Sequence, residues 1–192
     1  MWDCLNYNGL LNWYPDAMKE TETRVRKVMG KARMLIVCTH NQCLVKSTAN
    51  QDYTTTISVD NSPEEVFKAI NNVRGWWDGE IDGATDKLDG VFTYKYETFH
   101  NSKQKITALV PNKKVVWSVT EGGPKFTKNK VEWKGTEIVF EVTKKGDKTE
   151  IKFTHKGLIP RLECYDSCSN AWGFIINDSL RSFIVTGKGK QL

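Results

Sequence analysis

The chain has 192 residues and a formal net charge of +5 at pH 7, and hydrophobic residues make up 39% of it. This length suits one domain with an appendage, and the apolar content excludes a wholly disordered chain. No stretch approaches the roughly 18 apolar residues of a membrane-spanning helix, so we expect no stable membrane insertion. The start, Met1-Trp2-Asp3-Cys4, lacks a secretory signal, and five Cys leave one thiol unpaired. We therefore expect a reducing, cytoplasmic location.

Charge and hydrophobic pattern divide the sequence into an extension, residues 1–51, and a domain, residues 52–192. The extension carries a charge of +3 and the domain only +2. A nearly neutral domain with interspersed charges does not offer the basic surface that binds nucleic acid. Between Pro15 and Val37, the spacing of apolar and basic side chains fits an amphipathic helix that could bind a membrane surface or a partner. The alternative, which we favour, is a poorly ordered extension.

The domain begins with a predicted strand and a predicted helix. Residues 52–59 alternate in a β-branched run that is typical of a strand. Ser62 then suits an N-cap, Pro63 suits the first helical position, and Glu65 is placed to bond back to the cap. This capping box predicts a helix over residues 63–72.

Alternating apolar and polar side chains next predict a series of antiparallel strands. Their inner faces include rows such as Ile106, Ala108 and Val110. One apolar and one polar face on each strand indicates a sheet that is covered on one side only. The expected strands span residues 90–98, 104–110, 113–121, 136–143 and 148–157.

A long amphipathic helix is predicted over residues 165–186. Its apolar stripe recurs at three- and four-residue steps and contains Cys168, Trp172, Ile175, Ile176, Ser179, Leu180 and Phe183. Phe183 should therefore be buried. Gly187 follows directly and suits a left-handed helix stop. We expect an α+β helix-grip fold, with a curved antiparallel sheet wrapped around the long C-terminal helix.

Several segments together resemble the START-like SRPBCC superfamily. The strand and capped helix from Tyr53 to Ile70 are similar to its first two elements. Residues 134–140 and 149–158 are similar to its last two strands, and Trp172, Ser179, Leu180 and residues 186–189 to its C-terminal helix. The chain is most similar to the branch related to the activator of the heat-shock protein 90 ATPase. The resemblance covers about residues 52–190 and implies an apolar cavity between sheet and helix; some members bind lipids or other hydrophobic molecules, and some are cyclases.

The candidate site is the set of side chains expected on the inner faces of the sheet and the helix. We expect a ligand cavity lined by Trp76, Trp77, Phe92, Tyr94, Trp117, Phe140, Phe153, His155, Trp172 and Ile176. The alternative is a solid core, which aromatic side chains at such positions most often form. His155 could act as a general base, hold the polar end of a ligand, or be a hydrogen-bonded core residue.

No nucleotide-binding loop, zinc-ligand spacing or hydrolase elbow occurs, so we assign no catalytic residue, metal or other cofactor. Cys164 and Cys168 alone do not complete a metal site. We favour a non-catalytic domain that binds a small hydrophobic or amphipathic ligand. The alternatives are a chaperone-linked regulator that acts through its surface, and a cyclase- or dehydratase-type enzyme using His155 or a tyrosine. An accessible cavity beside Trp117 and Trp172 favours ligand binding, whereas a filled interior favours the regulator.

Overall fold

The computed structural model describes residues 24–28, 34–39, 42–47 and 50–192. The chain forms two compact units, Met1–Thr48 and Ala49–Leu192. The first contains a three-stranded antiparallel sheet in the order β1-β2-β3. Its strands are β1 (Arg24–Val28), β2 (Met34–Thr39) and β3 (Gln42–Ser47).

The strands β1 and β2 occupy residues at which the sequence pattern also fits an amphipathic helix. Strands therefore replace the helix over residues 24–28 and 34–37. The physical reason is local: β-branched side chains favour extended backbone, and in-register pairing, with Val25 opposite Val37, satisfies the backbone groups of both strands. The rest of that possible helix, residues 15–23 and 29–33, lies outside the described residues.

The second unit is built on a seven-stranded antiparallel sheet in the order β4-β10-β9-β8-β7-β6-β5. The last strand along the chain, β10, pairs with the first, β4, and places His155 opposite Tyr53. The predicted strands are confirmed, with β7 beginning four residues earlier than expected and the short β5 added at the edge. The strands are β4 (Tyr53–Val59), β5 (Glu80–Gly83), β6 (Val91–Tyr96), β7 (His100–Val110), β8 (Lys114–Pro124), β9 (Glu137–Lys145) and β10 (Lys148–Lys156).

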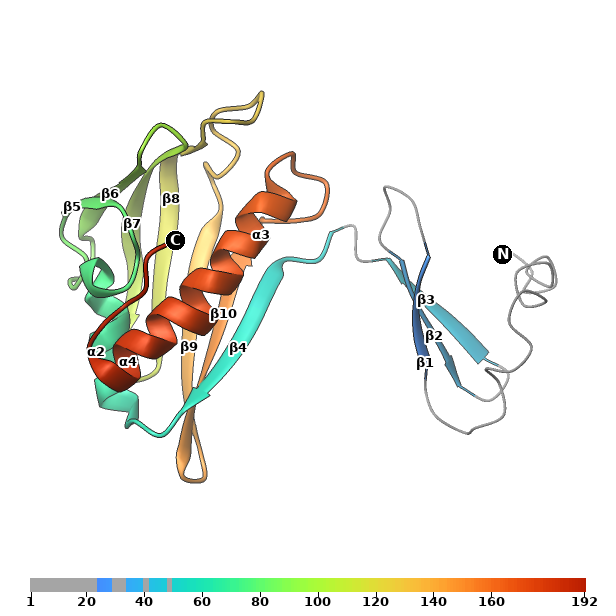
Figure 1. Ribbon diagram of the computed structural model, residues 1–192, viewed down its shortest axis with the longest axis horizontal. Helices are drawn as coiled ribbons and strands as arrows, with labels where there is room; N and C mark the ends of the chain where they lie inside the picture. The colour runs from blue at the N-terminus through green and yellow to red at the C-terminus, as the bar shows by residue number, and fades with distance from the viewer. Residues whose placement is uncertain (1–23, 29–33, 40–41, 48–49) are drawn as a thin grey trace. The chain divides into compact units, whose positions relative to one another are not determined.

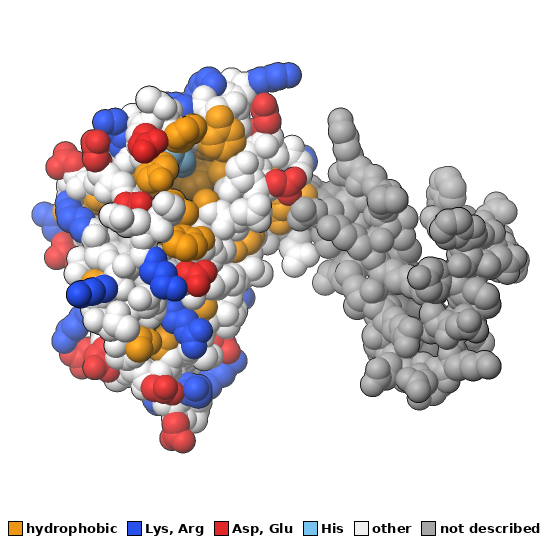
Figure 2. All heavy atoms as spheres, in the orientation of Figure 1, with side chains coloured by type: hydrophobic (Ala, Val, Ile, Leu, Met, Phe, Trp, Pro, Cys, Tyr) orange, Lys and Arg blue, Asp and Glu red, His pale blue; other side chains and the backbone are white. Residues whose placement is uncertain are grey.

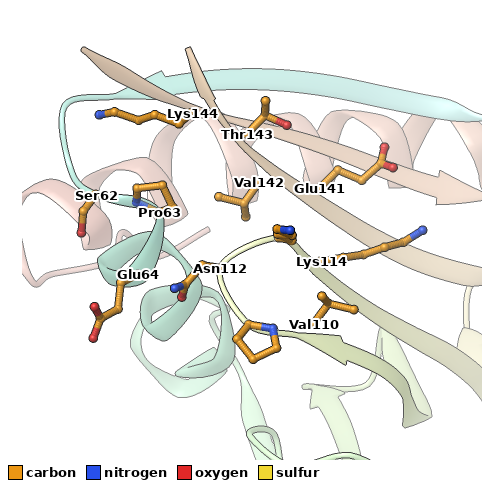
Figure 3. A pocket seen from close by; sticks show the side chains of 12 residues that line it. Ser62, Pro63, Glu64, Val110, Asn112, Lys114, Glu141, Val142, Thr143 and Lys144 are labelled. Carbon is orange, nitrogen blue, oxygen red and sulfur yellow. The ribbon is translucent and has the colours of Figure 1, made fainter. Parts of the chain in front are cut away.

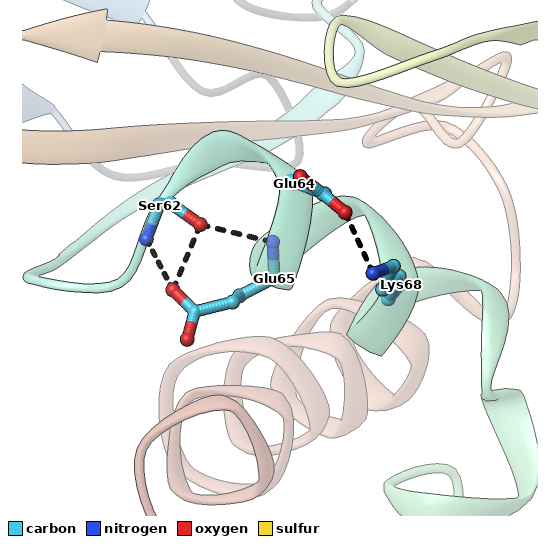
Figure 4. A network of polar contacts seen from close by, with 4 residues as sticks. All are labelled: Ser62, Glu64, Glu65 and Lys68. Carbon is cyan, nitrogen blue, oxygen red and sulfur yellow. Dashed lines mark hydrogen bonds and ion pairs between the residues drawn. The ribbon is translucent and has the colours of Figure 1, made fainter.

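The first helix of this unit, α2 (Pro63–Asn71), begins with the predicted capping box (Figure 4). The Ser62 N–H donates to Oε2 of Glu65 over 2.7 Å, and the Glu65 N–H donates to Oγ of Ser62 over 3.3 Å. The reciprocal bonds satisfy backbone donors that a helix start leaves free. A 3-10 turn, η3 (Val73–Gly75), then leads the chain towards β5.

The long C-terminal helix lies across one face of the curved sheet (Figure 1). It comprises α3 (Tyr165–Phe174), a π-helical segment η4 (Ile175–Leu180) and α4 (Arg181–Thr186). It ends at Gly187, whose φ of 75° is the predicted left-handed stop. The α+β helix-grip fold is confirmed. No helix in the described part of the chain is long and apolar enough to cross a membrane.

The π-helical segment corrects one burial prediction. Phe183 is only partly buried at the edge of the core, and Ile184 is the buried residue of α4. A π turn contains more residues than an α turn. The stripe is therefore shifted by about one residue beyond Leu180, and the 3.6-residue period no longer places Phe183 fully inside.

Candidate functional site

The side chains predicted to line a cavity all lie together between the sheet and the long helix. None of them exposes more than 4% of its surface. They come from the two residues after η3, from four strands of the sheet, and from the C-terminal helix. The set comprises Trp76, Trp77, Phe92, Tyr94, Trp117, Phe140, Phe153, His155, Trp172 and Ile176.

Aromatic rings fill much of this interior. Trp77 stacks on Tyr94 with ring centroids 4.0 Å apart and meets Trp172 at 5.0 Å. Phe153 contacts the other side of the cluster, 4.6 Å from Trp172. Rings at these separations touch one another, so the side chains themselves occupy the space between sheet and helix. The predicted residues are brought together, but as a packed cluster.

His155 is fully buried and has hydrogen bonds at both ring nitrogens. The Trp172 indole N–H donates to Nδ1 over 3.0 Å. Nε2 therefore carries the proton and donates to Oγ1 of Thr136, 2.9 Å away. Burial, together with the nearby His100, lowers the pKa of His155 to about 3. Neither bond involves a carboxylate, and these contacts fit the hydrogen-bonded core role.

A second polar group lies on the inner face of β7. The Gln104 Nε2 donates to Oγ of Ser102 over 2.6 Å, and Ser102 Oγ lies 2.9 Å from Nε2 of His100. The His100 ring also contacts Trp133, with centroids 4.4 Å apart. Burial is the main cause that lowers the pKa of His100 to about 3, with Lys125 adding to it. Both histidines of this unit are therefore neutral near pH 7.

Buried polar atoms without a hydrogen-bond partner include Oε1 of Gln104 and the indole nitrogens of Trp77, Trp117 and Trp133. We call these four atoms the unpaired polar set. All four side chains are at least 96% buried. Leaving a buried donor or acceptor unpaired costs about 1–3 kcal/mol. A buried polar atom of this kind can be satisfied by an ordered water, an ion or a ligand.

Sequence reasoning missed Gln104, Trp133 and Thr136. Trp133 falls in a lysine- and glycine-rich stretch that has no strand pattern, and Thr136 comes just before β9. His100 lies between two predicted strands, 90–98 and 104–110, and is the first residue of β7. Gln104 carried the one usable signal, because it occupies an inward position of an alternating strand where a polar side chain is unusual.

One end of the site reaches the surface. Figure 2 shows a hollow surrounded by hydrophobic side chains, with a histidine side chain at its base. His155 has no exposed surface, whereas His100 is partly exposed. Exposed hydrophobic side chains occur near His100 and Trp133 in the sequence: Phe99 precedes His100, and Phe126 and Val131 lie in the segment that leads to Trp133.

The segment before β9 is tied to the start of the long helix by two glutamates. Glu132 accepts the backbone N–H of Glu163 over 3.1 Å and that of Cys164 over 3.0 Å. In return, the Lys128 N–H donates to Oε2 of Glu163 over 2.9 Å. These bonds hold the segment that carries Trp133 against α3.

A separate open groove lies at the start of α2 (Figure 3). Its volume is about 1000 Å³, and it contains none of the predicted site residues. Both charged and apolar side chains line it, including Glu64, Lys114, Glu141 and the exposed Val110. Its lining residues are Ser62, Pro63, Glu64, Val110, Pro111, Asn112, Lys113, Lys114, Glu141, Val142, Thr143 and Lys144.

Cys164 and Cys168 are buried free thiols at the start of α3. A hydrogen bond with Cys168, followed by burial, raises the pKa of Cys164 above its usual range. The thiol of Cys164 therefore stays protonated, and little of the reactive thiolate forms. Within the described residues, no group of three or more His, Cys, Asp or Glu side chains could hold a metal ion.

Comparisons with known proteins agree with the fold. Residues 60–184 match the family model described as Activator of Hsp90 ATPase homolog 1-like protein. The Aha1 dimer from Colwellia psychrerythraea is 25% identical with a TM-score of 0.60, over 72% of this chain and 98% of that one. MLL2253 from Mesorhizobium loti is 12% identical with a TM-score of 0.55, over 71% and 99% of the two chains.

A third solved structure, SSP2350 from Staphylococcus saprophyticus, is 16% identical with a TM-score of 0.52, over 73% of this chain and 96% of that one. At such identity the likeness concerns the fold alone. A search of curated proteins gave no match. The family model covers well over half of the chain. The chain therefore belongs to the Activator of Hsp90 ATPase homolog 1-like family.

Proposed function

We propose that residues 50–192 bind a small hydrophobic or amphipathic molecule between the sheet and the C-terminal helix, without catalysis. The unpaired polar set carries this proposal. A buried polar atom costs little stability when it has a hydrogen-bond partner. A bound molecule with its own polar atoms can be that partner. The surrounding aromatic rings supply apolar contact for the rest of the molecule.

Binding in this interior requires side chains to move, because the rings now occupy much of the space. The segment 125–136 is the element best suited to move. It has no strand or helix of its own and carries Trp133, which stacks on Trp172 at 5.8 Å. Outward motion of this segment would draw Trp133 away from the helix and open the hollow that reaches the surface.

Titration of the full chain with Nile red, an uncharged dye whose emission responds to apolar surroundings, tests the proposal. We expect saturable binding with one dye per chain and a change in tryptophan emission. Glu132→Gln weakens the attachment of the segment to α3 and should raise the rates of dye binding and release. Glu141→Gln, on the outer face of β9, is the matched control. No saturable binding by the folded chain would overturn the proposal.

A second function, regulation of a chaperone through the surface, is favoured by the packed interior. The description of the family model and the likeness to an Aha1 structure support it. The open groove near α2 offers one surface for a partner, with Val110 exposed in it. The test is the ATPase rate of a purified Hsp90 with added chain. Val110→Glu should abolish any stimulation if the groove is the contact, whereas Val185→Glu, exposed on α4, should not.

The two buried free thiols fit a reducing compartment. A cytoplasmic location is accordingly part of the same proposal.

A further inference from the structure

We infer that one end of the second unit docks on an anionic membrane surface. This end, which we call the loop end, consists of residues 97–99, 125–136 and 157–164. The inference is independent of the proposed function, because it concerns the outside of the unit and needs no ligand in the interior. It follows from exposed aromatic side chains, from lysines without carboxylate partners, and from hydrogen bonds that fix the three connections.

The three connections of the loop end lie at the same end of the sheet, where α3 begins (Figure 1). The Lys125 N–H donates to the Phe99 carbonyl over 2.7 Å and so joins the segment 125–136 to the β6–β7 turn. The bonds of Glu132 and Glu163 described above attach the same segment to the start of α3. The exposed side chains of the segment are therefore held on one ordered surface.

Apolar side chains are unusually exposed at the loop end. Phe99 and Phe126 are 52% and 51% exposed, and Val131 is exposed as well. Phe126 directly follows Lys125, whose N–H bonds to Phe99, so the two phenylalanines come from adjoining backbone. Single exposed apolar residues are common, whereas neighbouring ones form a patch that marks an interaction surface.

Lysines are interleaved with these apolar side chains. Lys125, Lys128, Lys130 and Lys134 stand in one stretch of ten residues whose only acid is Glu132. No ion pair in the described part of the chain involves any of the four.

Lysines on the strands differ, since Lys95 pairs with Glu80 and Lys156 with Glu137, each at 3.1 Å. The charges of the segment are therefore available to an anion outside the protein. Figure 2 shows Lys or Arg side chains near the hydrophobic hollow.

The positive charge of the second unit is concentrated at the loop end. Its three connections hold five basic residues against three acidic ones, a net charge of +2, which equals the net charge of all residues 52–192. Two of the three carboxylates, those of Glu132 and Glu163, already accept backbone N–H groups. The basic residues are Lys125, Lys128, Lys130, Lys134 and Arg161.

Basic and aromatic side chains in this mixture fit the surface of an anionic bilayer. The lysines attract anionic headgroups, and the phenylalanine rings enter the boundary between headgroups and acyl chains. A fluid bilayer needs no complementary shape, whereas a stable protein partner needs a matching surface that buries at least about 1,000 Å². We therefore favour a membrane over an acidic protein. Docking of this kind lies on the bilayer without crossing it.

Sedimentation of the full chain with lipid vesicles tests the inference. One vesicle consists of phosphatidylcholine alone, and the other contains phosphatidylcholine and phosphatidylserine in equal parts. We expect at least about tenfold tighter binding to the anionic vesicle. Raising the NaCl concentration from about 0.1 M to about 1 M should weaken this binding, because the screening length falls from about 10 Å to about 3 Å.

Two variants locate the contact, since the basic extension could also bind anionic lipid. Lys128→Gln combined with Lys134→Gln removes two exposed charges and should weaken binding to the anionic vesicle by about tenfold. Phe126→Ala removes an exposed ring and should weaken it by about tenfold as well.

The matched controls make the same changes outside the loop end. Lys113→Gln combined with Lys188→Gln removes two exposed lysines that likewise form no ion pair among the described residues. Val185→Ala removes an exposed apolar side chain on α4. Both controls should bind within about twofold of the wild type, because charges distant from the bilayer are screened.

Equal binding of the wild type to both vesicles, or to neither, would overturn the inference. It is also overturned if either loop-end variant binds the anionic vesicle as tightly as its control. Binding to immobilised poly-L-glutamate without binding to vesicles would assign the surface to an acidic polypeptide instead. None of these results bears on the titration with Nile red, so the proposed function stands or falls separately.

Discussion

The indole N–H of Trp172 on α3 donates to Nδ1 of His155 on β10 over 3.0 Å, and both side chains are buried. This bond joins the long helix to the sheet at the centre of the aromatic cluster. Nδ1 accepts this bond and Nε2 donates to Oγ1 of Thr136, so the two hydrogen bonds fit the neutral imidazole with its proton on Nε2. Its protonation is therefore linked to unfolding.

The stability of the protein should fall as the pH drops below about 6.5, where an unfolded histidine begins to bind a proton. His155 in the folded state stays neutral down to its pKa of about 3. Between these values the unfolded state binds more protons, so the free energy of unfolding decreases with falling pH, by up to about 1.4 kcal/mol per pH unit for each such histidine.

Urea unfolding of the wild type and of His155→Gln at pH 7.0 and 5.5 measures this effect. The interval stays above most carboxyl pKa values. The variant should lose less stability than the wild type over the interval, although it is less stable at pH 7.0. Equal losses in both proteins would show that His155 is not kept neutral by the fold.

Ser179 should be the polar residue of the long helix most sensitive to mutation. Its buried hydroxyl donates to the Trp76 carbonyl over 2.6 Å and accepts the Lys190 N–H over 2.8 Å. Ser179→Ala leaves both partners without their bond and should cost about 1–3 kcal/mol. Ser167→Ala, on the exposed side of α3, should change stability by less than about 0.5 kcal/mol. Equal stability of the two variants would contradict these bonds.

The shift of the apolar stripe predicts a difference within α4. Ile184 is buried, whereas its neighbour Val185 is 60% exposed. Ile184→Ala should cost about 2–5 kcal/mol through lost burial and a residual cavity, whereas Val185→Ala should cost less than about 0.5 kcal/mol. Thermal or urea unfolding distinguishes them. A Val185→Ala variant that loses as much stability as Ile184→Ala would contradict the burial of Ile184 and the exposure of Val185.

The capping box of α2 should contribute measurably to stability. Ser62→Ala removes the side-chain bond to the Glu65 N–H and should cost about 0.5–2 kcal/mol. Glu64 forms an exposed ion pair with Lys68 one turn along, at 2.7 Å. Glu64→Gln is thus the control and should cost little, because exposed pairs contribute about 0–1 kcal/mol. A Ser62→Ala variant as stable as this control would argue against the cap.

Much of the fold follows from local patterns in the sequence. The alternation in the strands, the Ser62-to-Glu65 cap and the Gly187 stop each reflect a short-range physical requirement, and the structure contains all three. The inward position of His155 follows from the same alternation. Such features need only a few neighbouring residues to be determined.

Features that depend on irregular hydrogen bonding could not be predicted in this way. Register shifts interrupt β7, one of them between Ile106 and Ala108. A simple period of two would continue this row inward to Val110, which is instead 44% exposed. In the long helix, the π-helical segment likewise shifts the apolar face after Leu180. Neither irregularity has a marker in the pattern of apolar residues.

The unpaired polar set could not be predicted from the sequence either, because its four members come from separate parts of the chain. Trp77 lies after η3, Gln104 on β7, Trp117 on β8, and Trp133 in the segment before β9. Whether a buried polar atom has a partner depends on side-chain geometry from several elements at once. The sequence indicates an aromatic interior, and the structure adds the polar atoms that a ligand would satisfy.

Native mass spectrometry of the full chain, purified from the organism that makes it, tests ligand binding most directly. We predict a mass above that of the polypeptide, corresponding to one small molecule per chain that is released on unfolding. The same measurement on Trp117→Phe should show a reduced fraction of loaded protein. A spectrum containing only the bare chain, or the chain with a protein partner and no small molecule, would contradict the proposal.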